Sequence, residues 1–162
     1  MARKVFYSFH YDDDNWRTAT IKNIGAIEGN QTATPNKWEE VVKSDASIKK
    51  WIDDNLYGRS CLIVLVGSKT AGRKWINYEI EEAWKRGMGV FAINIHNIKD
   101  MFGEKCPQGK NPFETFTYKN GKFSNVVKCY NPIYSDSKDV YNYISSNIEK
   151  WIEEAILIRK NN

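Results

Sequence analysis

The chain is most apolar at Cys61-Leu62-Ile63-Val64-Leu65-Val66, a run that Gly67 and Ser68 end. A continuously apolar segment of this length is typical of a parallel strand covered on both faces. The next segment, residues 74–86, carries Ile76, Ile80 and Ala83 at the spacing of one helix face. A buried strand followed at once by an amphipathic helix indicates an α/β fold.

Two further strands are expected outside this unit, at Val5–Phe9 and at Val90–Ile95. Between the first strand and Cys61, the sequence predicts helices near residues 15–24 and 47–56, with an irregular stretch over residues 25–43. This alternation predicts a three-layer α/β sandwich with a mainly parallel central sheet. In such sheets ligands bind beyond the carboxyl ends of the strands.

The carboxyl-terminal part of the chain is less regular. Residues 97–123 are rich in Gly, Pro and Asn, which predicts a long irregular insertion over the surface. A last strand is expected within Val126–Tyr130 and a terminal helix over residues 137–158. A chain of 162 residues can bury one sizeable core, so we expect a single domain over residues 1–162.

Composition excludes several classes of protein. The net charge is +4, but the 24 basic residues are interspersed with 20 acids, a pattern that does not favour nucleic-acid binding. The amino-terminal apolar run is too short for a signal peptide, and no stretch is long enough to span a membrane. Three widely spaced cysteines predict reduced thiols in a cytoplasmic protein, with neither a disulfide framework nor a metal site.

Trp75 and Glu79 form the most informative pair of side chains. They are four residues apart on the helix after the apolar strand, and therefore share one face. An indole offers a stacking surface for a base, and a carboxylate accepts hydrogen bonds from ribose hydroxyls. By pattern alone, however, such a pair is more often core packing beside a solvated charge.

The same segments resemble a known family. Lys4–His10 is similar to the first box of TIR domains, where a strand ends in an aromatic residue and a polar loop. Val64–Thr70 and the following Trp75–Ile80 resemble the third strand and helix of that family, including its Trp-x-x-x-Glu signature. Over residues 3–97 the chain most resembles the bacterial TIR-like branch of the Thoeris anti-phage system, which implies a flavodoxin-like TIR sandwich.

This resemblance implies that the chain cleaves NAD, with Glu79 as the catalytic residue, and releases nicotinamide with ADP-ribose or a cyclic isomer. NAD is then the substrate, and no cofactor or metal is expected. Because nicotinamide leaves as a neutral molecule, one carboxylate can suffice, whereas ordinary glycosidases need a second carboxyl to protonate the leaving group. Glu79 would hold the ribose hydroxyls and stabilise positive charge at the anomeric carbon, which requires that it open onto a crevice.

The resemblance also suggests the residues that surround the substrate. Ser8, Phe9, His10 and Tyr11 should border the nicotinamide ribose, and Trp75 should support Glu79. Trp38 is a candidate for covering the bound base, although a role in pinning its loop to the core is as plausible. The expected partners are NAD, a separate effector protein that senses the diffusible product, and other copies of the chain.

Other functions remain open from the sequence. The chain could be a TIR interaction module that acts by self-association, with Trp75 and Glu79 only structural, or a nucleoside-handling enzyme such as a base-exchange transferase. ATP hydrolysis is rejected, because residues 67–74 place Arg73 where a phosphate-binding P-loop needs Lys. Asp12–Asp14 is interpreted as the N-cap of the first helix rather than as a metal site.

Overall fold

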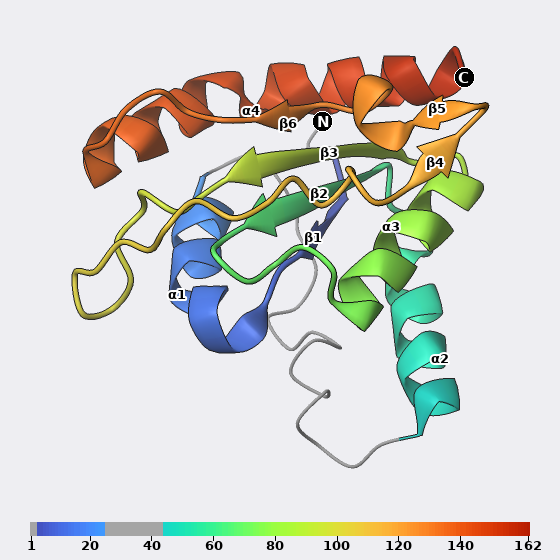
Figure 1. The fold of residues 1–162 in the computed structure, drawn as a ribbon, viewed down its shortest axis with the longest axis horizontal. Helices are drawn as coiled ribbons and strands as arrows, with labels where there is room; N and C mark the ends of the chain where they lie inside the picture. Colours follow the sequence, from blue (N-terminus) through green and yellow to red (C-terminus); the bar gives the residue numbers. More distant parts are fainter. Residues whose placement is uncertain (1–2, 25–43) are drawn as a thin grey trace.

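A computed structural model describes residues 3–24 and 44–162 of the chain. Its main sheet has four strands in the order β1-β2-β3-β6, and every neighbouring pair is parallel (Figure 1). The predicted α/β fold with a parallel sheet is confirmed. The strands are β1 (Val5–Ser8), β2 (Cys61–Val66), β3 (Gly89–Asn94) and β6 (Cys129–Tyr130).

Helices cover both faces of this sheet. Because successive strand residues point to opposite faces, β1 directs Val5 and Tyr7 to one side and Phe6 to the other. The first side packs against α1 and α4, and the second against α2 and α3. The result is the expected three-layer sandwich. The helices are α1 (Tyr11–Lys22), α2 (Asp45–Leu56), α3 (Lys74–Lys85) and α4 (Ser137–Lys160).

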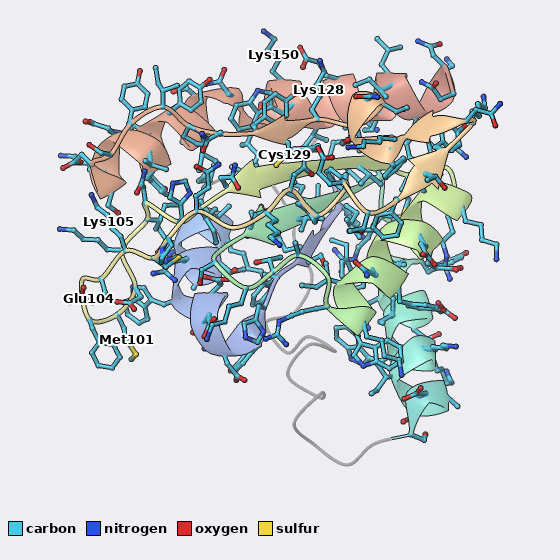
Figure 2. All side chains as sticks on the ribbon, viewed as in Figure 1. Met101, Glu104, Lys105, Lys128, Cys129 and Lys150 are labelled. Atoms are coloured by element: carbon cyan, nitrogen blue, oxygen red, sulfur yellow. The ribbon has the colours of Figure 1, made fainter. Side chains whose placement is uncertain are left out.

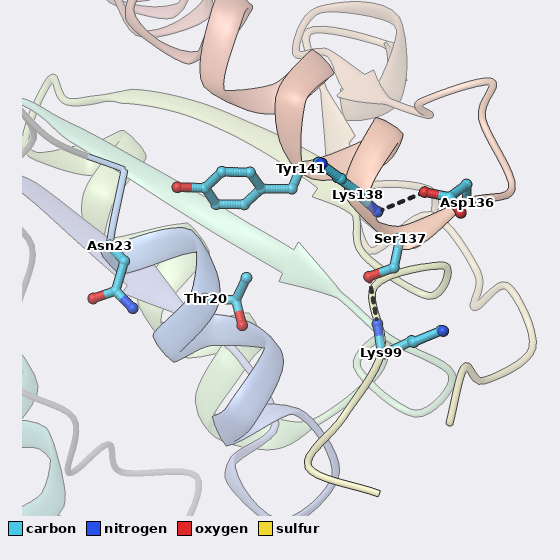
Figure 3. Close-up of a pocket in the computed structure, with 7 residues that line it drawn as sticks. All are labelled: Thr20, Asn23, Lys99, Asp136, Ser137, Lys138 and Tyr141. Carbon is cyan, nitrogen blue, oxygen red and sulfur yellow. Dashed lines mark hydrogen bonds between the residues drawn. The ribbon is translucent and has the colours of Figure 1, made fainter. Parts of the chain in front are cut away.

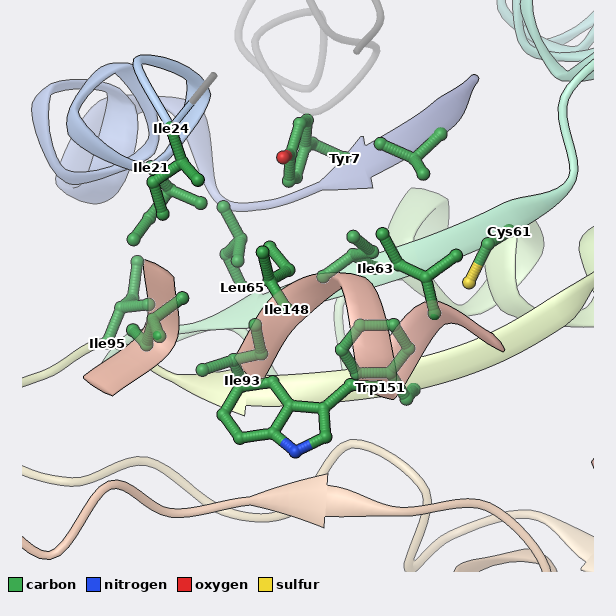
Figure 4. Close-up of a cluster of buried hydrophobic side chains, with 14 of the residues drawn as sticks. Tyr7, Ile21, Ile24, Cys61, Ile63, Leu65, Ile93, Ile95, Ile148 and Trp151 are labelled. Atoms are coloured by element: carbon green, nitrogen blue, oxygen red, sulfur yellow. The ribbon is translucent and has the colours of Figure 1, made fainter. Parts of the chain in front are cut away.

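The core between the sheet and α1 and α4 is mostly aliphatic, with Tyr7 and Phe9 at β1 and a group of aromatic side chains at its β6 end (Figure 4). Trp151 of α4 stacks on Tyr130 of β6 with their ring centroids 4.2 Å apart. Phe91 of β3 meets the edges of the same two rings. This contact fixes the long terminal helix against the edge strand of the sheet.

The predicted insertion at residues 97–123 contains one small hairpin, formed by β4 (Thr117–Tyr118) and β5 (Gly121–Lys122). Not all of this segment lies on the surface, because Phe113 and Phe123 are buried against the α2 and α3 side of the sheet. The Phe123 ring lies edge-on to Trp84 of α3 at 4.9 Å between centroids. Aromatic contacts therefore anchor a segment whose composition predicts only a surface loop.

Several boundaries differ from those predicted. The first helix begins at Tyr11 with His10 as its N-cap, so Asp12–Asp14 form its first turn and the predicted capping role is wrong. Acids in a first turn still stabilise the positive end of a helix. The last strand is only two residues long because it pairs only with Ala92 and Ile93. In the part of the chain that the structure describes, no helix has the length and apolarity needed to cross a membrane.

Candidate active site

The carboxyl end of β1 is joined to α3 by a hydrogen bond between two buried side chains. Ser8 is the last residue of β1, and the strand's alternation turns it toward the side that carries α3. Ser8 Oγ donates to Glu79 Oε1 at 2.6 Å, across 71 residues of sequence. Glu79 has 0% of its surface exposed. The fold therefore places the signature carboxylate at the strand end where ligands collect in this class of sheet.

A second contact joins the loops just outside this pair. His10 follows β1 and is buried, while Arg73 is the N-cap residue of α3. Arg73 Nη2 lies 2.9 Å from His10 Nε2, and Arg73 Nε donates to the Lys69 carbonyl at 2.9 Å. Asp13 Oδ2 lies 3.7 Å from His10 Nε2. The predicted residue His10 therefore follows Ser8 by two residues and is held by a cation from the loop after β2.

Trp75 lies on the buried side of α3, one turn before Glu79. It packs into the core between α2, α3 and the sheet, with its ring edge-on to Tyr78 at 5.9 Å between centroids. The ammonium group of Lys74 lies 4.8 Å from the centre of the indole. These contacts fix the first turn of α3, and Glu79 extends toward β1 from the next turn.

Two predicted substrate-binding residues lie elsewhere. Phe9 points to the opposite face of the sheet from Ser8, so it is buried in the core on the α1 and α4 side. Tyr11 packs against the same core and stacks on Phe9 with 6.4 Å between ring centroids. Trp38 lies outside the described residues. Of the predicted set, the structure bonds Ser8 to Glu79, with His10 two residues after Ser8 and Trp75 one turn before Glu79.

The expectation that Glu79 opens onto a crevice is not met, because its side chain is fully enclosed. A carboxylate in this position meets a dinucleotide only after some covering group has moved. The Arg73–His10 contact joins the segment after β1 to the start of α3, the same two parts of the chain that the Ser8–Glu79 bond joins. The reason for the difference is that helix spacing fixes which residues share a face, whereas side chains from other loops decide whether that face is open.

Sequence reasoning missed a buried ion pair beside the site. Arg17 Nη1 donates to Asp14 Oδ1 at 2.9 Å, and Arg17 also binds the carbonyls of Ile98 and Glu104 at 2.6 and 2.9 Å. Burial raises the pKa of Asp14 to about 6, an effect larger than the lowering by Arg17. The i,i+3 spacing of Asp14 and Arg17 was visible in the sequence, but the same spacing is common on solvated helix faces.

Gly67, directly after β2, has no space for a side chain. A Cβ atom there would overlap the Asp14 carboxylate, and a Cβ at Gly109 would overlap the Gly67 carbonyl. We expect Gly67→Ala to lower the free energy of unfolding by about 1–3 kcal/mol, because the Asp14–Arg17 pair must shift. Urea denaturation measures this change. Gly121→Ala is the control, since its nearest neighbour would be 3.8 Å from the new Cβ, and an equal loss in both variants contradicts the prediction.

A cavity of about 490 Å³ lies away from this region, between α1, the loop after β3 and the start of α4 (Figure 3). Asp136 caps α4 by accepting from the amides of Lys138 and Asp139, and Ser137 Oγ accepts from the Lys99 amide. The cavity is separate from the Ser8–Glu79 pair, because neither of these residues lines it. Its lining residues are Thr20, Asn23, Lys99, Asp136, Ser137, Lys138 and Tyr141.

The sheet is parallel, and the helix after its second described strand carries Trp75 and Glu79. Glu79 is bonded to the end of the first strand. Together these features define a TIR-like domain. Comparison with known families agrees: the family described as "Thoeris protein ThsB, TIR-like domain" matches residues 6–100. The chain belongs to this family, as its sequence resemblance predicted. Ser8, His10, Arg73 and Glu79 all lie within the matched segment.

A curated relative extends the similarity beyond this segment. The chain is 32% identical over 152 residues to the protein named "Putative cyclic ADP-D-ribose synthase ThsB1" from Bacillus cereus (strain MSX-D12). The alignment covers 88% of this chain and 79% of the relative. It therefore includes much of the carboxyl-terminal region that follows the family match.

Proposed function

We propose that this chain cleaves NAD at the bond between nicotinamide and ribose and forms a cyclic isomer of ADP-ribose as a signal in anti-phage defence. The observation that carries the proposal is the position of the Glu79 carboxylate, which Ser8 orients at the carboxyl end of β1. The name of the Bacillus cereus relative supports the same reaction. Glu79 is the proposed catalytic residue, with Ser8, His10 and Trp75 around it.

The chemistry suits a single carboxylate. When the bond between ribose C1′ and nicotinamide breaks, its electron pair goes to the pyridinium nitrogen, so nicotinamide leaves neutral without a proton from the protein. Positive charge then develops on C1′ and the ring oxygen of the ribose. A fixed carboxylate beside that centre stabilises this charge, and Ser8 holds the carboxylate in place.

A site that closes again around bound NAD would favour cyclisation over hydrolysis. After nicotinamide leaves, C1′ is attacked either by water or by a nitrogen atom of the adenine end of the same molecule. A site closed to bulk water lowers the chance of the first outcome. The cyclic product would diffuse through the cytoplasm to a separate effector protein, and self-association of the chain would help to assemble the site.

Incubation of the purified chain with NAD tests the proposal directly. Chromatography measures released nicotinamide, and mass spectrometry determines the second product. We expect a product whose mass is that of ADP-ribose minus one water, whereas ADP-ribose itself would show hydrolysis. The same assay on extracts of phage-infected cells that express the chain supplies any infection signal. Intact NAD in both settings would rule the proposed reaction out.

A further inference from the structure

Two contacts connect the end of β1 and the residues after it to α3. The inner contact is the Ser8–Glu79 hydrogen bond at 2.6 Å. The outer contact is between His10 and Arg73 at 2.9 Å. His10 and Arg73 lie farther toward the carboxyl edge of the sheet than Ser8 and Glu79, because β1 runs toward that edge and α3 starts from it.

The separation of the two contacts can be estimated from backbone geometry. Glu79 follows Arg73 by six residues, which is roughly 9 Å along the axis of an α-helix. His10 follows Ser8 by two residues, which is roughly 6–7 Å of extended chain. In NAD, one ribose ring separates the reacting C1′ from the diphosphate. A dinucleotide with its C1′ at Glu79 therefore reaches the level of Arg73 with its diphosphate.

The charge of the loop that carries Arg73 suits the diphosphate. The loop from Gly67 to Lys74 contains three cations and no acid, and the first turn of α3 has no acidic residue. Lys74 is bonded to Asp45 at 2.6 Å, while Lys69 lies 4.0 Å from Asp13, the carboxylate near the outer contact. An arginine presents a planar fork of donors that binds phosphate oxygens in pairs. Arg73 is half-buried, so its charge is less screened than that of the exposed Lys69.

We propose that Arg73 binds the diphosphate of NAD and releases its contact with His10 when it does so. The loss of this contact gives the substrate access to Glu79. This inference rests on the proposed function, because it takes the ribose of NAD to lie at Glu79. The enclosed carboxylate needs a covering group to move, and the proposal assigns this role to the Arg73–His10 contact, which joins the two segments that carry Ser8 and Glu79. No bond is made or broken in this exchange. Arg73 is thus a binding residue that couples substrate entry to access.

Calorimetry with ADP-ribose tests the proposal independently of catalysis, since ADP-ribose carries the diphosphate but lacks nicotinamide. We expect Arg73→Gln to weaken ADP-ribose binding by about 10- to 100-fold, and Arg73→Lys to weaken it less because the charge remains. Arg86→Gln is the matched control: Arg86 is the C-cap residue of the same helix and lies at its opposite end, beside Glu82 and Asp53. Thermal unfolding confirms that each variant folds. If Arg73→Gln does not fold, ADP-ribose binding is compared between Arg73→Lys and the parent.

Cleavage kinetics supply a second reading. A residue that holds the diphosphate in both ground state and transition state raises the KM for NAD more than it lowers kcat when it is removed. Unchanged ADP-ribose binding in Arg73→Gln, or an equal loss in Arg86→Gln, would overturn the diphosphate site. Arg73-dependent binding of ADP-ribose by a chain that leaves NAD intact would instead support this site and count against the proposed reaction.

Discussion

Replacing Glu79 with glutamine is expected to reduce nicotinamide release from NAD by about 10³-fold, the upper range for loss of one oriented electrostatic group. Glutamine has nearly the same shape and can still accept the hydrogen bond from Ser8. It lacks the negative charge that stabilises the developing positive charge on the ribose. The rate of nicotinamide release at saturating NAD measures the effect.

The matched control is Glu82→Gln on the same helix. Glu82 is partly exposed and interacts with Arg86 at 3.2 Å, so this variant removes the same charge without touching the Ser8 contact. It should cleave NAD at the parental rate. Both variants should unfold at temperatures close to that of the parent. A folded Glu79→Gln protein with near-parental cleavage would show that the carboxylate has no catalytic role.

The largest effect on stability is expected from Arg17→Met. Arg17 is 3% exposed, and its guanidinium joins α1 to the loop after β3 through the carbonyls of Ile98 and Glu104. Methionine fills much of the space but leaves the Asp14 carboxylate buried without its partner at 2.9 Å. Loss of one member of a buried pair costs about 3–5 kcal/mol of unfolding free energy. Urea denaturation at neutral pH measures it.

This loss should depend on pH. Burial already raises the pKa of Asp14 from 3.8 to about 6, and removal of Arg17 raises it further. Because the folded state then binds the Asp14 proton more tightly than the unfolded state, protonation stabilises the fold, and this contribution is lost as pH rises through the folded-state pKa. The variant should therefore lie closer to the parent at pH 5 than at pH 8. A gap that stays constant or widens on acidification would contradict this account of Asp14.

Arg3→Met is the control for the loss of an arginine partner. Arg3 makes a bidentate contact with Glu153, at 2.8 and 2.9 Å, but both side chains are about half exposed. Water solvates either charge when the other is absent, so little change in stability is expected. The loop that Arg17 holds carries Met101, Glu104 and Lys105 on the side of the molecule where α1 lies (Figure 2). Easier proteolysis of this loop in Arg17→Met would accompany the loss of stability.

The sequence alone established the elements of the fold. A continuously apolar strand at Cys61–Val66 and an amphipathic helix after it required a sheet covered on both faces, because neither element can leave its apolar surface in water. Spacing placed Trp75 and Glu79 on one face of the helix, and resemblance to TIR domains gave Glu79 its proposed role. These inferences depend on local geometry, which the sequence carries directly.

Tertiary structure decided which side chains meet. The sequence treated Ser8 and Phe9 as one site segment, whereas strand alternation in the folded sheet sends Ser8 to Glu79 and Phe9 to the opposite core. The Arg73–His10 contact joins residues that are 63 positions apart, and the contacts of Arg17 with the Ile98 and Glu104 carbonyls span 81 and 87 positions. Enclosure of Glu79 likewise depends on several segments packing together. Periodicity reports on neighbours within one element, and only the packed chain determines which elements bring their charges to the same place.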